Sequence, residues 1–228
     1  MTDPGSDARP APFPRELLAG DTLAAARAIL GAYLVRDPAP DEPAADRRVG
    51  RIVEVEAYVG EGDRASHARF GPTDRNRVMF GPPGVAYVYL VYGMYHCLNV
   101  VTEPAPRPAA LLVRAVEPIA GIAAMRAARA SSRPGIGTRP PPDARLASGP
   151  GLVCAAFSID RSHTGLDLCD PGSPLRLEAP SAGDGRPEIV ETPRIGIDYA
   201  GEPWASVPWR FVVAGSGSVS GRARRPGR

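Results

Sequence analysis

The sequence contains no lysine, few cysteines or histidines, and no long apolar run. All 27 basic residues among the 228 are arginine, and they leave a formal net charge of only +2. Because there is no side-chain amine, catalysis through a lysine Schiff base is excluded. The near balance of charge says little by itself about which partners the protein binds.

Cysteine and histidine are too sparse for a metal site or a disulfide framework. The chain has three of each, and the odd number and uneven spacing of the cysteines argue against disulfide pairs and a zinc site. It has neither an apolar leader segment nor a run of about 18 apolar residues, so we expect no membrane span. The sequence predicts a cytoplasmic protein with no metal or other cofactor.

The pattern of elements favours one α+β domain. No linker separates two balanced apolar regions, so we expect one folded domain at residues 14–216 between disordered ends at 1–13 and 217–228. Helices are predicted at 23–30, at 119–130 and from 148 onward, and strands at 51–58, 85–92, 97–102, 109–116, 194–199 and 209–214. The Gly- and Pro-rich stretch 59–84 reads as a long loop, and such loops are usually functional.

Four of the seven tyrosines fall in one short run, residues 85–99. Tyr87 and Tyr89 are two apart and therefore project from the same face of a strand. Tyr92 breaks this alternation and precedes Gly93, which is typical of a hairpin turn with an exposed ring at its tip. Singly, each tyrosine fits a core position with a satisfied hydroxyl. As a set beside acidic residues, they fit a dry core poorly.

Two glutamates on the strand predicted at 51–58 carry the strongest chemical signal. Glu54 and Glu56 lie on one face, with side chains roughly 6–7 Å apart. Two acids at that distance must be solvated, paired or used in chemistry. The pair therefore fits two interpretations, the solvated face of an edge strand or an active site. Tyr58 extends the same face and His67 lies in the adjoining loop, which favours a pocket for a flat polar ligand.

Short motifs run in order along most of the chain, at residues 50–58, 65–67, 75–77, 79–80, 87–95, 99, 112–118 and 148–150. Together they resemble the alkyladenine (3-methyladenine) DNA glycosylase family, from about residue 18 to about residue 215. The resemblance implies a compact α+β fold with a curved, mostly antiparallel sheet and flanking helices. It also implies a protruding β-hairpin that inserts into the minor groove of DNA.

The resemblance further implies a monofunctional enzyme of base-excision repair. Such an enzyme flips alkylated or deaminated purines, for example 3-methyladenine or hypoxanthine, out of duplex DNA and hydrolyses the N-glycosidic bond. Glu56 would activate the attacking water. Tyr58, His67 and Tyr89 would enclose the flipped base, and Tyr87 would line the pocket more distantly. No lyase activity is expected, in keeping with the absence of lysine.

Five further residues are predicted to contact DNA: Asn99, Tyr92 and Arg114 by the same resemblance, and Arg75 and Arg77 because arginines of the loop at 59–84 could contact phosphates. Asn99 would lie on the pocket floor and exclude guanine through its exocyclic amino group. Tyr92 would fill the gap left in the base stack. Arg114, Arg75 and Arg77 would hold the phosphate backbone, although each arginine also fits a solvated surface. The expected partner is double-stranded DNA containing damaged purines, bound by a monomer that is associated with the nucleoid while on DNA.

The residues leave two other functions open. A non-catalytic nucleic-acid binder could use the same hairpin and stacking slot. It would release no base, whether or not Glu56 is present. A hydrolase of small nucleosides could use the pair Glu54 and Glu56, and it would be indifferent to Tyr92→Ala. The sequence does not rank the possible lesions.

Overall fold

One antiparallel sheet of eight strands organises the part of the chain that the structure describes. The computed structural model describes residues 11–132, 141–181 and 183–221. The strands are β1 (Tyr33–Arg36), β2 (Arg48–Val59), β3 (Ala86–Val91), β4 (Tyr95–Thr102), β5 (Ala109–Ala120), β6 (Leu175–Glu178), β7 (Ile189–Thr192) and β8 (Arg210–Val213). The α-helices are α1 (Glu16–Ala19), α2 (Thr22–Ile29), α3 (Ile122–Ser131) and α4 (Pro150–Phe157). Short 3₁₀ helices are η1 (Ala44–Asp46), η2 (His67–Phe70), η3 (Arg77–Phe80), η4 (Asp143–Arg145), η5 (Arg161–His163) and η6 (Asp198–Ala200).

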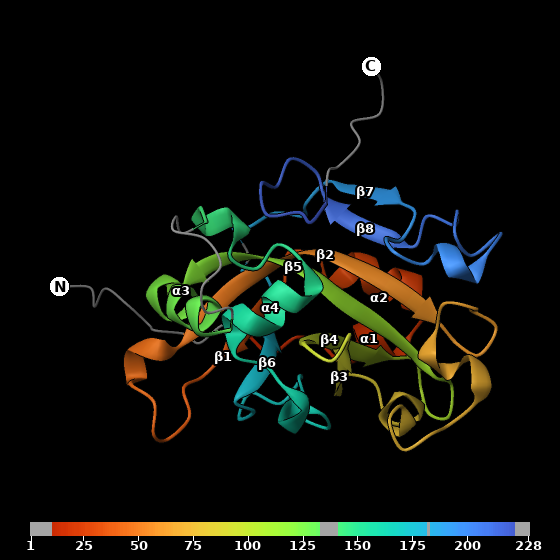
Figure 1. Cartoon of the computed structure of the whole chain (residues 1–228), viewed down its shortest axis with the longest axis horizontal. Helices are drawn as coiled ribbons and strands as arrows, with labels where there is room; N and C mark the ends of the chain where they lie inside the picture. Colours follow the sequence, from red (N-terminus) through yellow and green to blue (C-terminus); the bar gives the residue numbers. More distant parts are fainter. Residues whose placement is uncertain (1–10, 133–140, 182, 222–228) are drawn as a thin grey trace.

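The long strands β2 and β5 form the centre of this sheet (Figure 1). The strand order is β3-β4-β5-β2-β1-β6, while β8 pairs with β2 and β7 pairs with β8. Helix α4 packs on β4 and β5 at the front of Figure 1, α2 packs on β2, and α1 packs on α2 and β4. Buried residues from these layers, among them Leu111, Phe157 and Phe211, form one continuous core. The predicted α+β domain with a curved antiparallel sheet is confirmed.

The helix starts follow from local sequence. The Asp21 carboxylate accepts a hydrogen bond of 2.8 Å from the backbone N–H of Ala24, which satisfies one free donor of α2. Pro150 begins α4, where its missing N–H costs nothing. The strands predicted at 51–58, 85–92, 97–102, 109–116 and 209–214 are present. Strands β1 and β6, four residues each, were not predicted.

The strand predicted at residues 194–199 is wrong. The strand of this region is β7, which ends at Thr192, and η6 begins at Asp198. Of the alternating apolar residues in this segment, Ile197 is buried, but Ile195 and Tyr199 are 41% and 68% exposed. Gly196 has φ +77°, a left-handed conformation that ends an extended run. The segment is therefore an irregular loop, and its path matters for the site described below.

Both predicted ends of the domain need correction. Phe13 is buried, and the carbonyl of Ala11 accepts a hydrogen bond from Ala179. Ser218 and Ser220 are also buried, so ordered packing extends beyond 14–216 on both sides. Residues 1–10 and 222–228, which carry the rest of the predicted disordered ends, lie outside the described residues. Within the described ranges, no helix is long and apolar enough to cross a membrane.

Candidate active site

The two glutamates of β2 are both fully buried. Glu54 and Glu56 have 0% exposure, and β2 is bonded to β5, β1 and β8 rather than lying at an edge. This rules out a solvated edge strand. Glu54 binds Arg210 Nε at 2.6 Å and the backbone N–H of Ser220 at 2.5 Å. The predicted proximity of the two acids is confirmed, because Arg114 contacts both carboxylates at 3.2 Å.

Glu56 is held by three donors from three segments of the chain. Its Oε2 accepts from the Tyr58 hydroxyl at 2.9 Å and from Arg114 Nη1 at 3.2 Å. Its Oε1 accepts from the backbone N–H of Ile195 at 2.7 Å. A carboxylate offers about four acceptor positions, so one remains for a further donor such as a water molecule. The arrangement suits a carboxylate that orients a water molecule.

Arg114 joins the two acids. Its guanidinium binds Glu54, Glu56 and the Ser220 hydroxyl. Burial by itself would lower the pKa of Arg114, but the charges of Glu56 and Glu54 outweigh it and raise the pKa. The Arg114 side chain is only 10% exposed and forms ion pairs with both carboxylates. Its contact with a DNA phosphate stays a prediction.

A slot of about 60 Å³ opens beside this network. It is lined by Tyr58, Ala65, His67, Met79, Tyr87, Tyr89, Asn99, Ala110 and Tyr199. His67 and Tyr89 meet edge to face with centroids 4.5 Å apart, and Tyr87 lies 5.5 Å from Tyr89. Tyr58 packs in a different cluster, with Ala65 and Ile197. The structure thus brings all five predicted pocket residues to one slot, with Tyr58 in one group of side chains and His67, Tyr87 and Tyr89 in the other.

Asn99 and the tyrosines are fixed by hydrogen bonds and burial. The Asn99 amide nitrogen donates to the carbonyl of Tyr87 at 3.0 Å, and the residue is buried. Burial, with a smaller contribution from the charge of Glu56, raises the pKa of Tyr58 well above its ordinary value. The Tyr58 hydroxyl therefore stays protonated and acts as a donor to Glu56.

The surroundings of His67 favour the neutral form of its imidazole. Desolvation by the pocket walls, followed by the charges of Arg75 and Arg69, lowers the pKa of His67 to about 4. Its Nδ1 lies 3.1 Å from the Tyr87 hydroxyl. His67 is exposed to solvent, which partly screens the arginine charges. An uncharged imidazole is a suitable flat neighbour for a base.

This shift predicts a pH-dependent stability. The ordinary pKa of histidine is 6.5, and the pKa of His67 in the folded protein is about 4. Between pH 6.5 and pH 4, His67 therefore binds a proton in the unfolded chain but not in the folded one. Stability therefore falls as the pH drops from about 6.5 toward 4. We expect the wild type to lose more stability than His67→Gln between about pH 7.5 and about pH 5, measured by urea unfolding. Equal losses in the two proteins would contradict the shift.

Tyr92 lies at the tip of the hairpin formed by β3 and β4. Val91 pairs with Tyr95, and Tyr92 and Gly93 have φ of +51° and +70°, as in the tight turns that join twisted strands. Tyr92 is 85% exposed and Met94 is 67% exposed. Tyr92 is thus an exposed ring at the turn between β3 and β4, and its insertion into DNA stays a prediction.

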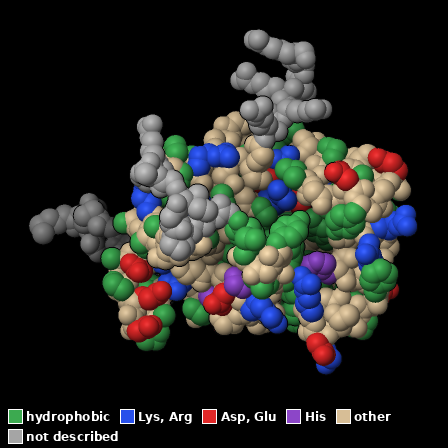
Figure 2. Space-filling model, in the orientation of Figure 1, with side chains coloured by type: hydrophobic (Ala, Val, Ile, Leu, Met, Phe, Trp, Pro, Cys, Tyr) green, Lys and Arg blue, Asp and Glu red, His purple; other side chains and the backbone are tan. Residues whose placement is uncertain are grey.

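Arg75 and Arg77 lie in the segment before this hairpin. The Arg75 guanidinium lies 5.3 Å from the Tyr89 ring centroid and donates to the Leu90 carbonyl. Arg77 forms an exposed ion pair with Asp74 at 2.7 Å. Figure 2 shows hydrophobic side chains near the middle of this face, with basic side chains around them and most visible acidic ones toward its margins. That distribution is compatible with a polyanion, and the phosphate contacts themselves stay predictions.

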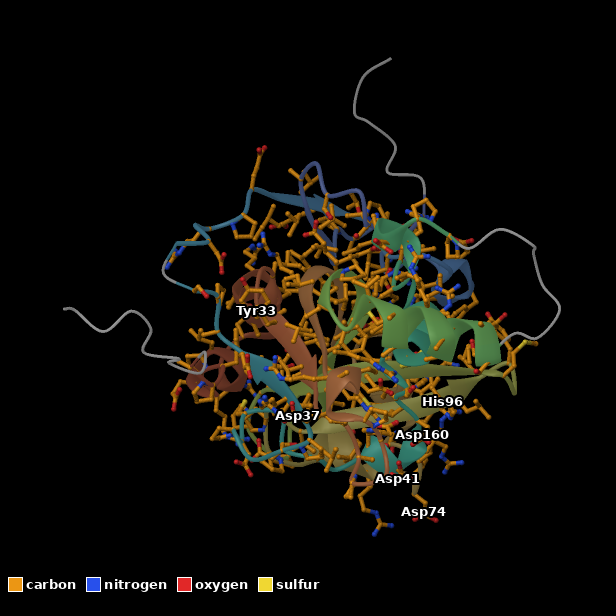
Figure 3. All side chains as sticks on the ribbon, turned by 90° about the vertical axis from the view of Figure 1, so that its left-hand side faces the viewer. Tyr33, Asp37, Asp41, Asp74, His96 and Asp160 are labelled. Carbon is orange, nitrogen blue, oxygen red and sulfur yellow. The ribbon has the colours of Figure 1, made fainter. Side chains whose placement is uncertain are left out.

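A second cavity, of about 270 Å³, lies beside the hairpin. Met94 and His96 line it together with residues of α3 and α4 and with Asp160. Figure 3 labels His96 and Asp160 on the side of the molecule that also carries Asp74. Among the described residues, no group of three or more His, Cys, Asp or Glu could hold a metal ion.

Several groups of the site were not predicted from the sequence. Tyr199 lines the slot, Ile195 supplies an N–H to Glu56, and Ser220 binds Glu54. Each comes from a segment more than 100 residues from β2. A backbone N–H carries no signature in sequence, and Tyr199 was assigned to a strand that does not exist.

Comparison with known proteins gives a consistent result. The family model described as methylpurine-DNA glycosylase (MPG) matches residues 16–217. A protein of Methanocella arvoryzae, provisionally named a 3-methyladenine DNA glycosylase, is 48% identical over 92% of this chain and 96% of its own length. A protein of Myxococcus xanthus with the same provisional name is 45% identical over 95% of this chain and 96% of its own length.

Proposed function

The chain belongs to the methylpurine-DNA glycosylase family, and from the geometry of its pocket we propose how this DNA N-glycosylase releases a damaged purine. The observation that carries the proposal is a fully buried Glu56, held by three donors, in β2 two residues before Tyr58 of the aromatic slot. The damaged nucleotide leaves the duplex and its base enters the slot. Glu56 then activates the water that replaces the base.

Binding of the flipped base uses the two groups of rings. Tyr58 stacks on one face of the base, and His67 with Tyr89 covers the other. Stacking of a base on an aromatic side chain contributes on the order of 1–3 kcal/mol, which offsets part of the cost of leaving the helix. Tyr92, exposed at the hairpin tip, occupies the space that the base vacates.

The chemical step breaks the bond between the sugar C1′ and the base nitrogen. The electron pair of this bond leaves with the base, and positive charge builds on the sugar. The Glu56 carboxylate stabilises that charge and accepts the proton of the water whose oxygen bonds to C1′. Arg114 and the Ile195 N–H fix the carboxylate orientation.

The pocket favours a base that leaves without an added proton. An alkylated purine such as 3-methyladenine is already cationic and is a good leaving group. Hypoxanthine is neutral and requires a proton or a hydrogen-bond donor on leaving. His67, with its pKa lowered to about 4, is a poor source of that proton at neutral pH. Release of neutral bases is therefore expected to be slower than release of alkylated ones.

The substrate is duplex DNA rather than a free nucleoside. Duplexes carrying methylated purines or a single hypoxanthine should lose the damaged base, while free inosine and methylated nucleosides should not be cleaved. We expect Tyr92→Ala to lower base release at low enzyme concentration by roughly tenfold, because a stacking contact of about 1–3 kcal/mol is lost. Free nucleoside turnover that is unchanged by Tyr92→Ala would instead support a nucleoside hydrolase.

One pocket acts on one nucleotide, so the proposal needs no second subunit. A monomer acting on chromosomal DNA would work in the cytoplasm at the nucleoid. Sedimentation of the protein with and without a lesion duplex tests the subunit count: one protein per lesion supports the proposal, and an obligate dimer contradicts it.

A further inference from the structure

Arg194 is a buried arginine outside the slot that touches several parts of the active site. Its side chain and that of Asp63 are both 0% exposed, and they form two contacts of 2.5 and 2.9 Å. Arg194 Nη1 also donates to the backbone carbonyl of Ala57 at 2.9 Å. Ala57 is the residue between Glu56 and Tyr58. A buried ion pair contributes little net stability compared with apolar packing, so the position of this one suggests another role.

The guanidinium also supports a wall of the slot. It lies 4.7 Å from the ring centroid of Tyr58 and 5.1 Å from that of Trp209, within the range of cation–π attraction. Tyr58 both stacks on the flipped base, in the proposed function, and donates to Glu56 at 2.9 Å. Support of this ring therefore affects both the base and the carboxylate.

The residue after Arg194 supplies a donor to the catalytic group. The Ile195 N–H binds Glu56 Oε1 at 2.7 Å, although the surrounding segment is an irregular loop with no sheet partner to hold it. The fixed side chain of Arg194 anchors this loop to Asp63 and to β2 through Ala57. The position of the Ile195 N–H thus depends on Arg194.

Asp63 extends the same network toward the other side of the slot. Its carboxylate accepts from the backbone N–H groups of Val59 and Ala65 at 3.2 and 3.0 Å. These bonds shape the turn that leads from β2 to His67. The pair of Asp63 and Arg194 therefore connects Glu56, Tyr58 and the segment that carries His67.

We propose that Arg194, held by Asp63, is a positioning residue for base release: it orients Glu56 through the Ile195 N–H and supports Tyr58 behind the flipped base. This inference rests on the proposed function. Arg194 does not touch the reacting atoms. A purely structural role would change stability and leave the release rate of a bound lesion unchanged.

The test uses a double variant that leaves no unpaired buried charge. Asp63→Asn with Arg194→Met is compared with the wild type in two measurements. Affinity is measured with a duplex containing a tetrahydrofuran abasic analogue, and the single-turnover rate is measured as release of 3-methyladenine from methylated duplex DNA. We expect affinity within about threefold of the wild type and a rate roughly ten- to hundredfold lower, since small misplacements of catalytic groups have effects of this size.

A matched control comes from a second buried pair at the opposite edge of the sheet. Arg176 binds Glu178 at 2.9 Å on β6, and β6 lies at the far end of the strand order from β3. Glu178→Gln with Arg176→Met likewise removes a buried carboxylate and a buried guanidinium. Asp37 also loses its contact with Arg176, but it is 39% exposed and keeps Arg47 as a partner. This variant should release 3-methyladenine at the wild-type rate. An equal loss of rate in this control would show a general structural effect and overturn the proposal.

The conservative variant Arg194→Lys keeps the charge pair but loses the planar group between Tyr58 and Trp209. Its rate is expected to lie between those of the wild type and the double variant, and it provides the test if the double variant does not fold. An active wild type with equally fast Arg194 variants would overturn this inference and leave the proposed function intact. A wild type that releases no base would overturn both.

Discussion

Glu56→Gln is expected to lower the single-turnover rate of 3-methyladenine release by roughly 10²–10⁴-fold, the usual contribution of a positioned general base. The amide keeps the size of the side chain and loses the charge that, in the proposed mechanism, stabilises the sugar cation and accepts the proton from water. Affinity for a duplex with a tetrahydrofuran analogue should stay close to that of the wild type, because the stacking rings and the hairpin are unchanged.

Glu178→Gln is the matched control for this change. Glu178 is also a buried glutamate on a strand, bound to an arginine, and it lies on β6, away from the slot. Its variant should release base at the wild-type rate. If Glu56→Gln retained the wild-type rate as well, Glu56 would not be the catalytic carboxylate, and the water would have to be activated by another group.

Arg114→Met is expected to destabilise the fold more than any other single substitution considered above. It removes the cation between two carboxylates that are 0% exposed. Loss of one partner of a buried charge pair costs about 3–5 kcal/mol, a large fraction of the roughly 5–15 kcal/mol that stabilises a typical domain. The free energy of unfolding, measured in urea, should fall by about this amount.

The cause of that loss can be checked with a second change. Adding Glu54→Gln to Arg114→Met removes one of the stranded charges and should recover part of the stability. Arg77→Met provides the contrasting case, because its ion pair has side chains 76% and 98% exposed, and it should change stability by less than about 1 kcal/mol. An Arg114→Met protein as stable as the wild type would show that the carboxylates are not charged together in the fold.

The sequence was sufficient where the signal is local and periodic. Tyr87 and Tyr89 share a face because side chains alternate along a strand, and Tyr92 is exposed because the alternation breaks before Gly93. Glu54 and Glu56 meet for the same reason. Residues this close along one strand have few alternative arrangements once the strand is formed.

The sequence was insufficient where the site is assembled from distant segments. Ile195, Ile197 and Tyr199 alternate as in a strand. Gly196 instead has a left-handed backbone conformation, and the buried Arg194 beside it forms an ion pair with Asp63, so the segment follows an irregular path. Whether Glu54 faced solvent or a cation could not be decided locally either, because the answer depends on Arg210 and Ser220, more than 150 residues away. Partners at that separation are fixed by the tertiary fold, not by spacing.

The most direct test of the account is chromatography of the bases that the wild-type protein releases from methylated duplex DNA. We predict that free 3-methyladenine accumulates well above spontaneous depurination, and that the DNA strand stays intact until alkali cleaves the abasic site. Failure to release any base above the spontaneous rate would contradict the assignment of Glu56 and the aromatic slot as a glycosylase site.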